Sequence, residues 1–186
     1  MLVKDKMTRG PYVVTPDTCV SAALKTMRDG RFRRLPVVQA DKLVGIVTDK
    51  ELRDADPSKP LVEDVMHKQP LTVQEDALLE TAALMMRTNK VGALPVMKEN
   101  ALVGIITESD IFDTFLDMMG IRGPGRRLQL TLPDVVGSLA DVTGIISAYD
   151  CNICNIVYSG EGELMVRLED GNIEGAVAEL KKAGYL

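Results

Sequence analysis

The chain has 186 residues, which at about 100 to 200 residues per domain allows one ordinary domain or a few small ones and excludes a large multidomain enzyme. Hydrophobic residues make up 46% and charged residues 26%, as in soluble globular proteins that bury a core. The 22 basic and 27 acidic residues give a net charge of -5, which disfavours non-specific binding to nucleic acid or to an anionic membrane.

No apolar stretch approaches the roughly 18 to 20 residues that a membrane helix needs, and residues 1–6 contain no apolar signal core. We therefore expect a cytoplasmic protein. The cysteines, Cys19, Cys151 and Cys154, are odd in number and too few for a disulfide scaffold, which agrees with a reducing compartment. The single histidine, His67, excludes a His-rich metal site and leaves little room for a Ser-His-Asp arrangement, so we expect no metal and a surface or cleft-lining position for it.

The first two thirds of the chain contain an internal repeat. A shift of 59 residues aligns residues 7–52 with residues 66–111 without a gap, and 15 of the 46 pairs are identical. The shared positions include the Leu-Pro-Val runs at 35–37 and 94–96 and the Leu-Val-Gly-Ile runs at 43–46 and 102–105. Each copy is therefore expected to form one supersecondary unit.

Within a copy, the pattern predicts a strand, a helix, two strands and a helix. Asp17 or Thr18 is expected to cap the first helix of the first copy. This helix should stop at Gly30, and its counterpart in the second copy should stop at Asn89. Apolar residues at helical spacing form its buried stripe: Val20, Ala23, Leu24 and Met27, repeated as Leu79, Ala82, Ala83 and Met86. Strands are predicted at 35–38 and 43–47 with a turn at 40–42, and another helix near Asp49. A copy of about 55 residues buries too little surface alone, so the two copies should pack together.

The runs Gly-Ile-Val-Thr-Asp-Lys-Glu at 45–51 and Gly-Ile-Ile-Thr-Glu-Ser-Asp at 104–110, each preceded by Leu-Pro-Val and an apolar strand, resemble those of tandem CBS domains. The resemblance covers about residues 1–120. It implies a Bateman module, that is, a pseudo-twofold pair of domains at 1–60 and 61–120. The clefts of such a module commonly bind adenosine-containing ligands, which implies AMP, ADP, ATP or S-adenosylmethionine as a regulatory ligand.

The family's ribose-binding pattern is a Ser or Thr followed three residues later by Asp, and Thr107 with Asp110 meets it in the second copy. A strand that ends in a hydroxyl and leads into a helix offers free backbone N–H groups to an anion, and the carboxylate can accept hydrogen bonds from ribose hydroxyls. In the first copy Thr48 is followed by Glu51, whose extra methylene should push the carboxylate roughly 1.5 Å further out. We therefore favour the second-copy site over the first.

Arginines precede the first Leu-Pro-Val run, where similar proteins line the cleft, and their guanidinium forks suit phosphate oxygens. The equally weighted alternative is a solvated basic run. The counterparts of Arg33 and Arg34 in the second copy, Gly92 and Ala93, are small and uncharged and would leave room for a base. The expected nucleotide-binding set is Thr107, Asp110, Val91, Gly92, Ala93, Pro95, Arg31, Arg33, Arg34 and Thr48.

Residues 121–126 are rich in Gly and Pro and are predicted to form a linker. After it, Leu128, Leu130 and Leu132 alternate as in a half-buried strand. The pattern then predicts a turn at 133–137, a helix, strands near 153–158 and 164–168, and a last helix. The apolar stripe of the first of these helices is Leu139, Val142, Ile145 and Ile146, and that of the last helix is Ile173, Val177 and Leu180.

That order and the Leu-Pro-Asp-x-x-Gly turn resemble an ACT domain, a ferredoxin-like module that often binds amino acids, over about residues 127–186. Such a domain normally ends in a fourth strand, which we expect to be missing or truncated here, leaving a sheet edge open or covered by a partner. The resemblance places a weak amino-acid site at Asp134, Val135 and Gly137, with Asn152 opposite. A role in dimerisation or coupling is the alternative.

Cys151 and Cys154 have the C-x-x-C spacing, but they lie between a predicted helix end and a strand instead of at a helix N-terminus, where a thiol pKa is lowered. A zinc site would need a second pair of soft ligands. Two ordinary, partly buried cysteines are the favoured interpretation, and a thiol oxidoreductase is the rival.

The sequence therefore predicts an α+β protein: two tandem CBS domains packed as a pseudo-twofold pair, then a ferredoxin-like ACT domain that lacks its last strand. This combination resembles the acetoin-utilisation protein B family. It predicts a ligand-sensing regulator and no enzyme, with no catalytic residue and no tightly bound cofactor. A homodimer is expected, with a regulated enzyme or transporter as a further partner and no nucleic acid or membrane. A scaffold with vestigial ligand clefts is the alternative.

Overall fold

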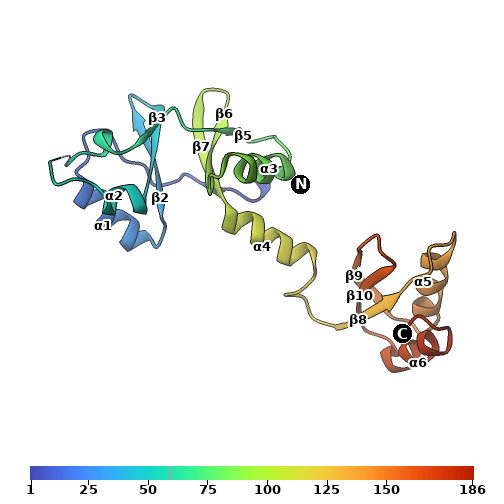
Figure 1. Ribbon diagram of the computed structural model, residues 1–186. Coiled ribbons are helices and arrows are strands. Elements are labelled where there is room, and N and C mark those ends of the chain that lie inside the picture. Colours follow the sequence, from blue (N-terminus) through green and yellow to red (C-terminus); the bar gives the residue numbers. More distant parts are fainter. Residues whose placement is uncertain (59) are drawn as a thin grey trace. The chain divides into compact units, whose positions relative to one another are not determined.

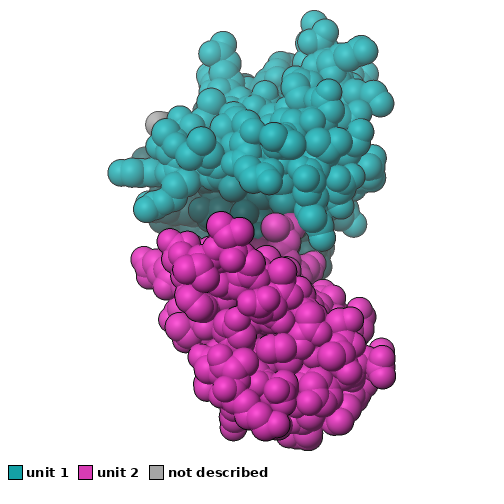
Figure 2. All heavy atoms as spheres, turned by 90° about the vertical axis from the view of Figure 1, so that its right-hand side faces the viewer, with its two compact units in different colours: residues 1–112 teal, residues 113–186 magenta. Residues whose placement is uncertain are grey.

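The computed structural model describes residues 1–58 and 60–186, and the chain divides into two compact units, Met1–Phe112 and Asp113–Leu186 (Figure 2). In the described part of the chain, no helix combines the length and the apolar character required to cross a membrane.

The second repeat forms all the predicted elements, whereas the first forms only an isolated bridge between Val14 and Val37 where its first strand was predicted (Figure 1). The first contains α1 (Val20–Gly30), β2 (Arg34–Gln39), β3 (Lys42–Thr48) and α2 (Asp49–Arg53). The second contains β5 (Val73–Gln74), α3 (Leu79–Asn89), β6 (Ala93–Lys98), β7 (Ala101–Thr107) and α4 (Glu108–Met118). Short 3-10 turns, η1 (Val3–Asp5) and η2 (Val62–Asp64), and two-residue strands, β1 (Thr8–Arg9) and β4 (His67–Lys68), lie between or before them.

The ends of α1 differ from the prediction. Its N-cap is Cys19, which makes no side-chain capping bond, while the hydroxyl of Thr18 accepts a hydrogen bond from the N–H of Thr15 at 3.1 Å. The predicted cap at Asp17 or Thr18 is therefore wrong, because Thr18 closes the preceding turn. At the other end Gly30 is still helical, and Arg31 adopts the left-handed conformation with φ 55°.

The end of α3 repeats this geometry. Asn89 is its last helical residue, and Lys90 takes the left-handed conformation with φ 55°. The expectation that the Gly and Asn residue types would take up this strained backbone is wrong in both repeats, where a long basic side chain occupies the position instead.

The two repeats exchange short strands. β1, at the start of the first repeat, pairs antiparallel with β7 of the second, with Thr8 opposite Ile105. β4, at the start of the second repeat, pairs antiparallel with β3 of the first, with His67 opposite Ile46. The two registers are identical after the shift of 59 residues found in the sequence. The exchange is therefore reciprocal, and the pair has pseudo-twofold symmetry.

The hydrophobic cores follow the exchange. Val3, which is fully buried, packs in the core of the second repeat, and its N–H donates to the carbonyl of Ala77 at 2.9 Å. Val62, also fully buried, packs in the core of the first repeat, and its N–H donates to the carbonyl of Thr18 at 2.9 Å. Each core is thus completed by a segment that precedes the other repeat in the sequence.

The C-terminal unit has the predicted order of strand, helix, strand, strand and helix. Its elements are β8 (Arg126–Thr131), α5 (Ser138–Ala148), β9 (Asn152–Tyr158), β10 (Glu163–Glu169) and α6 (Ile173–Lys182). The three strands form an antiparallel sheet in the order β8-β10-β9. Their inward side chains pack with both helices in one core, which includes Leu130, Leu164, Leu168, Val142, Ile146 and Leu180.

One edge of this sheet, at β8, is partly covered by the residues that follow α6. The carbonyl of Tyr185 accepts a hydrogen bond from the N–H of Thr131 at 2.8 Å, and the Tyr185 ring packs against the core. The chain after α6 therefore runs beside β8 and satisfies one of the free donors of that edge.

Candidate functional site

The predicted ribose site of the second repeat lies where β7 ends and α4 begins. The N–H and the hydroxyl of Thr107 both donate to Oδ2 of Asp110, each at 2.7 Å. The carboxylate faces back over the first turn of the helix because a side chain three residues after the cap can reach the cap's own backbone. A hydroxyl and a carboxylate, both half-buried, are thus held together at the end of a strand.

In the first repeat Thr48 and Glu51 form the same arrangement. The N–H and the hydroxyl of Thr48 donate to Oε2 of Glu51 at 2.7 and 2.6 Å. The expectation that the longer side chain would carry the carboxylate outward is wrong, because Glu51 bends back and caps the helix as Asp110 does. Its other oxygen, Oε1, lies 2.8 Å from Nε2 of His67 on the exchanged strand β4.

These contacts set the charge state of Glu51. Burial alone would raise its pKa, but the hydrogen bonds from the side chain and backbone of Thr48 and from His67 together hold the pKa below its ordinary value. Sequence reasoning missed the pairing with His67. The contact follows from the pairing of β3 with β4, which places His67 opposite Ile46, two residues before Thr48.

Four predicted site residues lie on or just before β6, which pairs with the strand that ends in Thr107. Ala93 lies opposite Thr107 and Pro95 opposite Ile105 in the pairing of β6 with β7. Both are buried, whereas Val91 and Gly92 are half-buried. The carbonyl of Gly92 accepts a hydrogen bond from the N–H of Glu108 at 3.1 Å.

The three arginines of the first repeat separate into two groups. A Cβ added to Gly92 would lie 2.0 Å from Nη2 of Arg34, so the Arg34 guanidinium occupies the space over that glycine. Oε2 of Glu108 lies 2.8 Å from the same position, so the first repeat brings a positive charge beside a carboxylate at the Thr107 turn of the second. Arg31 and Arg33 instead line a different hollow, of about 350 Å³, to which neither Thr107 nor Asp110 contributes.

The C-terminal unit has a hollow at the predicted amino-acid site. It has a volume of about 230 Å³ and is lined by Asp134, Val135 and Gly137, together with Ser138 and Tyr158 among others. The hydroxyl of Ser138 donates to the carbonyl of Pro133 at 2.8 Å and holds the turn closed. Asn152 does not contribute to this hollow, since it begins β9 whereas Tyr158 ends it. Tyr158 and Ser138 were missed because their strand and helix positions alone do not indicate a site.

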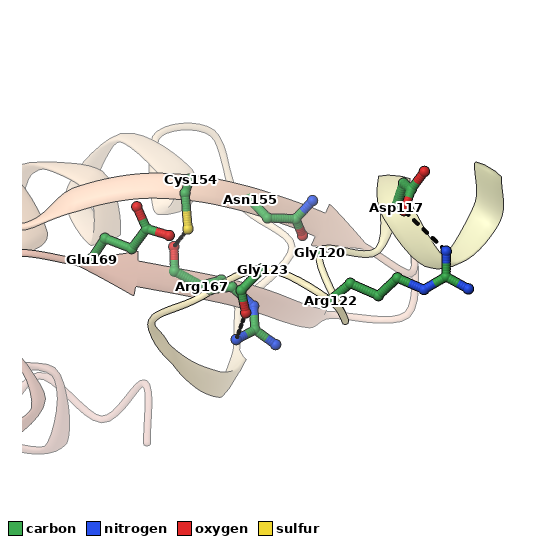
Figure 3. Close-up of a pocket in the computed structure, with 8 residues that line it drawn as sticks. All are labelled: Asp117, Gly120, Arg122, Gly123, Cys154, Asn155, Arg167 and Glu169. Atoms are coloured by element: carbon green, nitrogen blue, oxygen red, sulfur yellow. Dashed lines mark hydrogen bonds and ion pairs between the residues drawn. The ribbon is translucent and has the colours of Figure 1, made fainter. Parts of the chain in front are cut away.

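A second hollow of the C-terminal unit, of about 330 Å³, lies beside the predicted linker (Figure 3). Nη1 of Arg167 donates hydrogen bonds to the carbonyls of Gly123 and Gly125 at 3.2 and 3.0 Å. The side-chain amide of Asn155 donates to the carbonyl of Met118 at 2.5 Å, at the end of α4. The glycine-rich segment is therefore tied to the sheet of the C-terminal unit.

Cys154 lines this hollow, whereas Cys151 is buried in the core. Burial and the nearby Asp150 carboxylate raise the pKa of Cys151, and partial burial and the Glu169 carboxylate raise that of Cys154. The Cys154 thiol donates to the carbonyl of Arg167 at 3.3 Å. Raised thiol pKa values oppose thiolate formation, on which redox exchange depends.

The family model for the CBS domain matches residues 3–58 and 62–117, which together make up more than half of the chain. Solved structures similar to the same region include the three that follow. The CBS domain pair of protein MJ0100, in complex with 5'-methylthioadenosine and S-adenosyl-L-methionine, is 29% identical with a TM-score of 0.59, and the match covers 62% of this chain and 95% of that one.

CBSX2 in complex with AMP is 31% identical with a TM-score of 0.58, over 62% of this chain and 96% of that one. The Vibrio cholerae protein described as an acetoin utilization protein (AcuB) is 32% identical with a TM-score of 0.60, over 66% of this chain and 95% of that one. With the matched repeats, the exchanged strands and the paired Thr-x-x-acid turns, the chain belongs to the CBS domain family, of which it carries two copies.

Proposed function

We propose that the protein is a non-enzymatic regulator that senses an adenosine-containing ligand, such as AMP, ADP, ATP or S-adenosylmethionine, in the cleft of its second repeat. The observation that carries the proposal is the Thr107 and Asp110 pair, with its hydroxyl and carboxylate held 2.7 Å apart at the end of β7. Similar CBS pairs are described in complex with AMP and with S-adenosyl-L-methionine, which supports this ligand class.

The second repeat is favoured over the first because Thr107 and Asp110 keep the family's ribose-binding pattern, whereas Glu51 replaces the aspartate in the first repeat. Oε1 of Glu51 is engaged by His67 at 2.8 Å, so a ribose at the first repeat would have to displace that contact. At the second repeat the Arg34 guanidinium over Gly92 supplies a positive charge that suits the phosphate of a nucleotide.

Calorimetry with AMP, ADP, ATP and S-adenosylmethionine tests the proposal. Asp110→Ala should weaken binding by about 10- to 100-fold, since a charge-assisted hydrogen bond contributes roughly 1.5 to 3 kcal/mol. Glu51→Ala is the matched control, because it removes the same two capping hydrogen bonds from the other repeat. Equal affinities for wild type and Asp110→Ala would contradict the assignment, and failure of all four ligands to bind would favour a scaffold with vestigial clefts.

We further propose that the C-terminal unit is an ACT-type module that binds an amino acid at the turn after β8. The hollow lined by Asp134, Val135 and Gly137 supports this, because it joins one carboxylate with exposed turn backbone. Calorimetry with a panel of amino acids, on wild type and Asp134→Ala, tests it. Binding that survives unchanged in Asp134→Ala would exclude this turn as the site.

Coupling between the two ligands is the proposed mechanism of regulation. The helix α4 that contains Asp110 leads into the segment held by Asn155 and Arg167, so nucleotide binding should alter hydrogen exchange in residues 128–186. If saturating nucleotide slows exchange near Asp110 and leaves residues 128–186 unchanged, the sites are energetically separate and the coupled mechanism is wrong.

A further inference from the structure

The single histidine of the chain lies against the carboxylate of the first repeat. Nε2 of His67 is 2.8 Å from Oε1 of Glu51, while Oε2 of Glu51 accepts hydrogen bonds from the N–H and the hydroxyl of Thr48. Both oxygens of this carboxylate are therefore engaged within the protein. A carboxylate that recognises a ribose must accept hydrogen bonds from its hydroxyls, so the imidazole lies at an oxygen that the ribose would require.

The two repeats hold the histidine position in the same backbone geometry. In the first repeat β4 carries His67 against β3, and in the second β1 carries Thr8 against β7. A Cβ added to Gly45 would lie 3.0 Å from the carbonyl oxygen of His67, and one added to Gly104 would lie 3.0 Å from that of Thr8. The exchanged strand therefore approaches its partner equally closely in both repeats.

The side chains at the two ends of this contact differ between the repeats. After the shift of 59 residues, Thr8 takes the place of His67, and Asp110 takes the place of Glu51. Both replacements are shorter, and Asp110 still returns to Thr107 as a cap. The fold therefore requires neither the imidazole nor the extra methylene, and their joint occurrence in the first repeat needs another explanation.

Stability does not supply this explanation. The side chain of His67 is 67% exposed and that of Glu51 is 25% exposed, and ion pairs between exposed side chains contribute little to the folded state because water screens them. The hydrogen bonds from Thr48 cap α2 without any help from the histidine. What the histidine does change is the contact that the carboxylate can offer to a ligand.

We propose that His67 closes the ribose site of the first repeat and so determines which of the two clefts takes the ligand. The inference rests on the proposed ligand class, but it concerns a residue that does not itself bind the ligand. The imidazole holds Oε1 of Glu51 while Thr48 holds Oε2, so a ribose must break one contact before it can make another. The second repeat therefore fills first, and the first repeat stays empty at concentrations that saturate the second.

Transfer of both side chains from the second repeat to the first tests the proposal. The double variant Glu51→Asp with His67→Thr gives the first repeat residues that the same backbone already holds in the second. Calorimetry with AMP should give one equivalent per chain for wild type and two for this variant. 2′,3′-Dideoxy-AMP should gain no second equivalent, because it lacks the hydroxyls that the carboxylate recognises.

A single substitution isolates the effect of the imidazole. In the Asp110→Ala background, where the second cleft is weakened, His67→Thr should tighten AMP binding by about fivefold or more, because the contact to be displaced is gone. Lys68→Thr in the same background is the matched control. It removes a positive charge from the neighbouring position of β4 and should change the affinity by less than about twofold.

A measurement without ligand tests the contact itself. Because the chain has one histidine, its ring gives a single set of NMR signals. Glu51→Gln should shift these signals, since it changes the group that lies 2.8 Å from Nε2. Glu63→Gln, at an exposed position of η2 four residues before His67, should leave them in place.

The outcomes separate this inference from the proposed function. One equivalent of AMP in both wild type and the double variant would retain sensing by the second repeat and overturn the closing role of His67. No binding by wild type and one equivalent in the double variant would overturn the proposed function and retain the closing role, and no binding by either would overturn both. Two equivalents in wild type, an unchanged affinity on His67→Thr, or ring signals that ignore Glu51→Gln would each overturn the closing role.

Discussion

The exchanged segments predict that a mutation at the start of one repeat weakens the core of the other. Val3 and Val62 are fully buried, and each packs in the repeat to which it does not belong by sequence. Substitution by alanine removes two carbon atoms, which at about 0.8 kcal/mol per buried CH₂ amounts to roughly 1.6 kcal/mol before any cavity is counted. With the cavity, we expect each variant to lose about 2 to 3 kcal/mol of unfolding free energy.

Hydrogen exchange followed by mass spectrometry of native protein locates the effect. Val3→Ala should raise exchange chiefly in α3 and β6, and Val62→Ala chiefly in α1 and β2, by about tenfold or more for amides that exchange through local opening. Val13→Ala is the control, because Val13 is 46% exposed and its loss should change stability by about 0.5 kcal/mol or less. Faster exchange confined to α1 and β2 in Val3→Ala would refute the exchanged arrangement.

Three further predictions concern assembly, pH and the linker. Exposed apolar side chains such as Leu84, which is 67% exposed on α3, favour a homodimer with about twice the 20.3 kDa mass of the chain. Analytical ultracentrifugation measures this mass, and a monomer at all protein concentrations, with and without nucleotide, would exclude the dimer. The folded-state pKa of Glu51 lies below the ordinary 4.5, so its carboxylate stabilises the fold above pH 4.5 and ceases to do so as the pH falls through the lowered pKa. In denaturant titrations Glu51→Gln should therefore be less stable than wild type at neutral pH, and the difference in unfolding free energy should shrink below pH 4.5. A difference that does not depend on pH would contradict this. Arg167→Met should speed limited trypsin cleavage after Arg122 and Arg126 several-fold, because the carbonyls of Gly123 and Gly125 lose their hydrogen-bond donor. Cleavage at the wild-type rate would show that Arg167 does not hold this glycine-rich segment in place.

The sequence periodicity predicted most of the regular structure. The apolar stripes of α1 and α3 and the alternation in β8 are local patterns, and the 59-residue shift indicated two equivalent units. The strand exchange was not predictable in this way. β1 and β4 have two residues each, and their pairing with β7 and β3 depends on residues far away in the sequence, for which no local pattern exists.

The candidate site was predicted in part for a similar reason. Thr107 and Asp110 lie within one turn of helix, so their contact follows from their spacing. The contact of Glu51 with His67 depends on the exchanged strand, and its return to Thr48 depends on a rotamer that spacing does not determine. The hollow that Arg31 and Arg33 line also includes Arg53 of the later helix α2, so only the folded structure brings these arginines together.

The strand exchange has the form of a domain swap, but both partners belong to one chain. Between separate molecules such an exchange would depend on protein concentration, because each half is completed only when it meets the other. Covalent connection replaces that concentration by a fixed effective concentration, which for short connections is in the millimolar range. Dilution should therefore leave the paired repeats intact, whereas cutting the chain between them would make their folding depend on concentration.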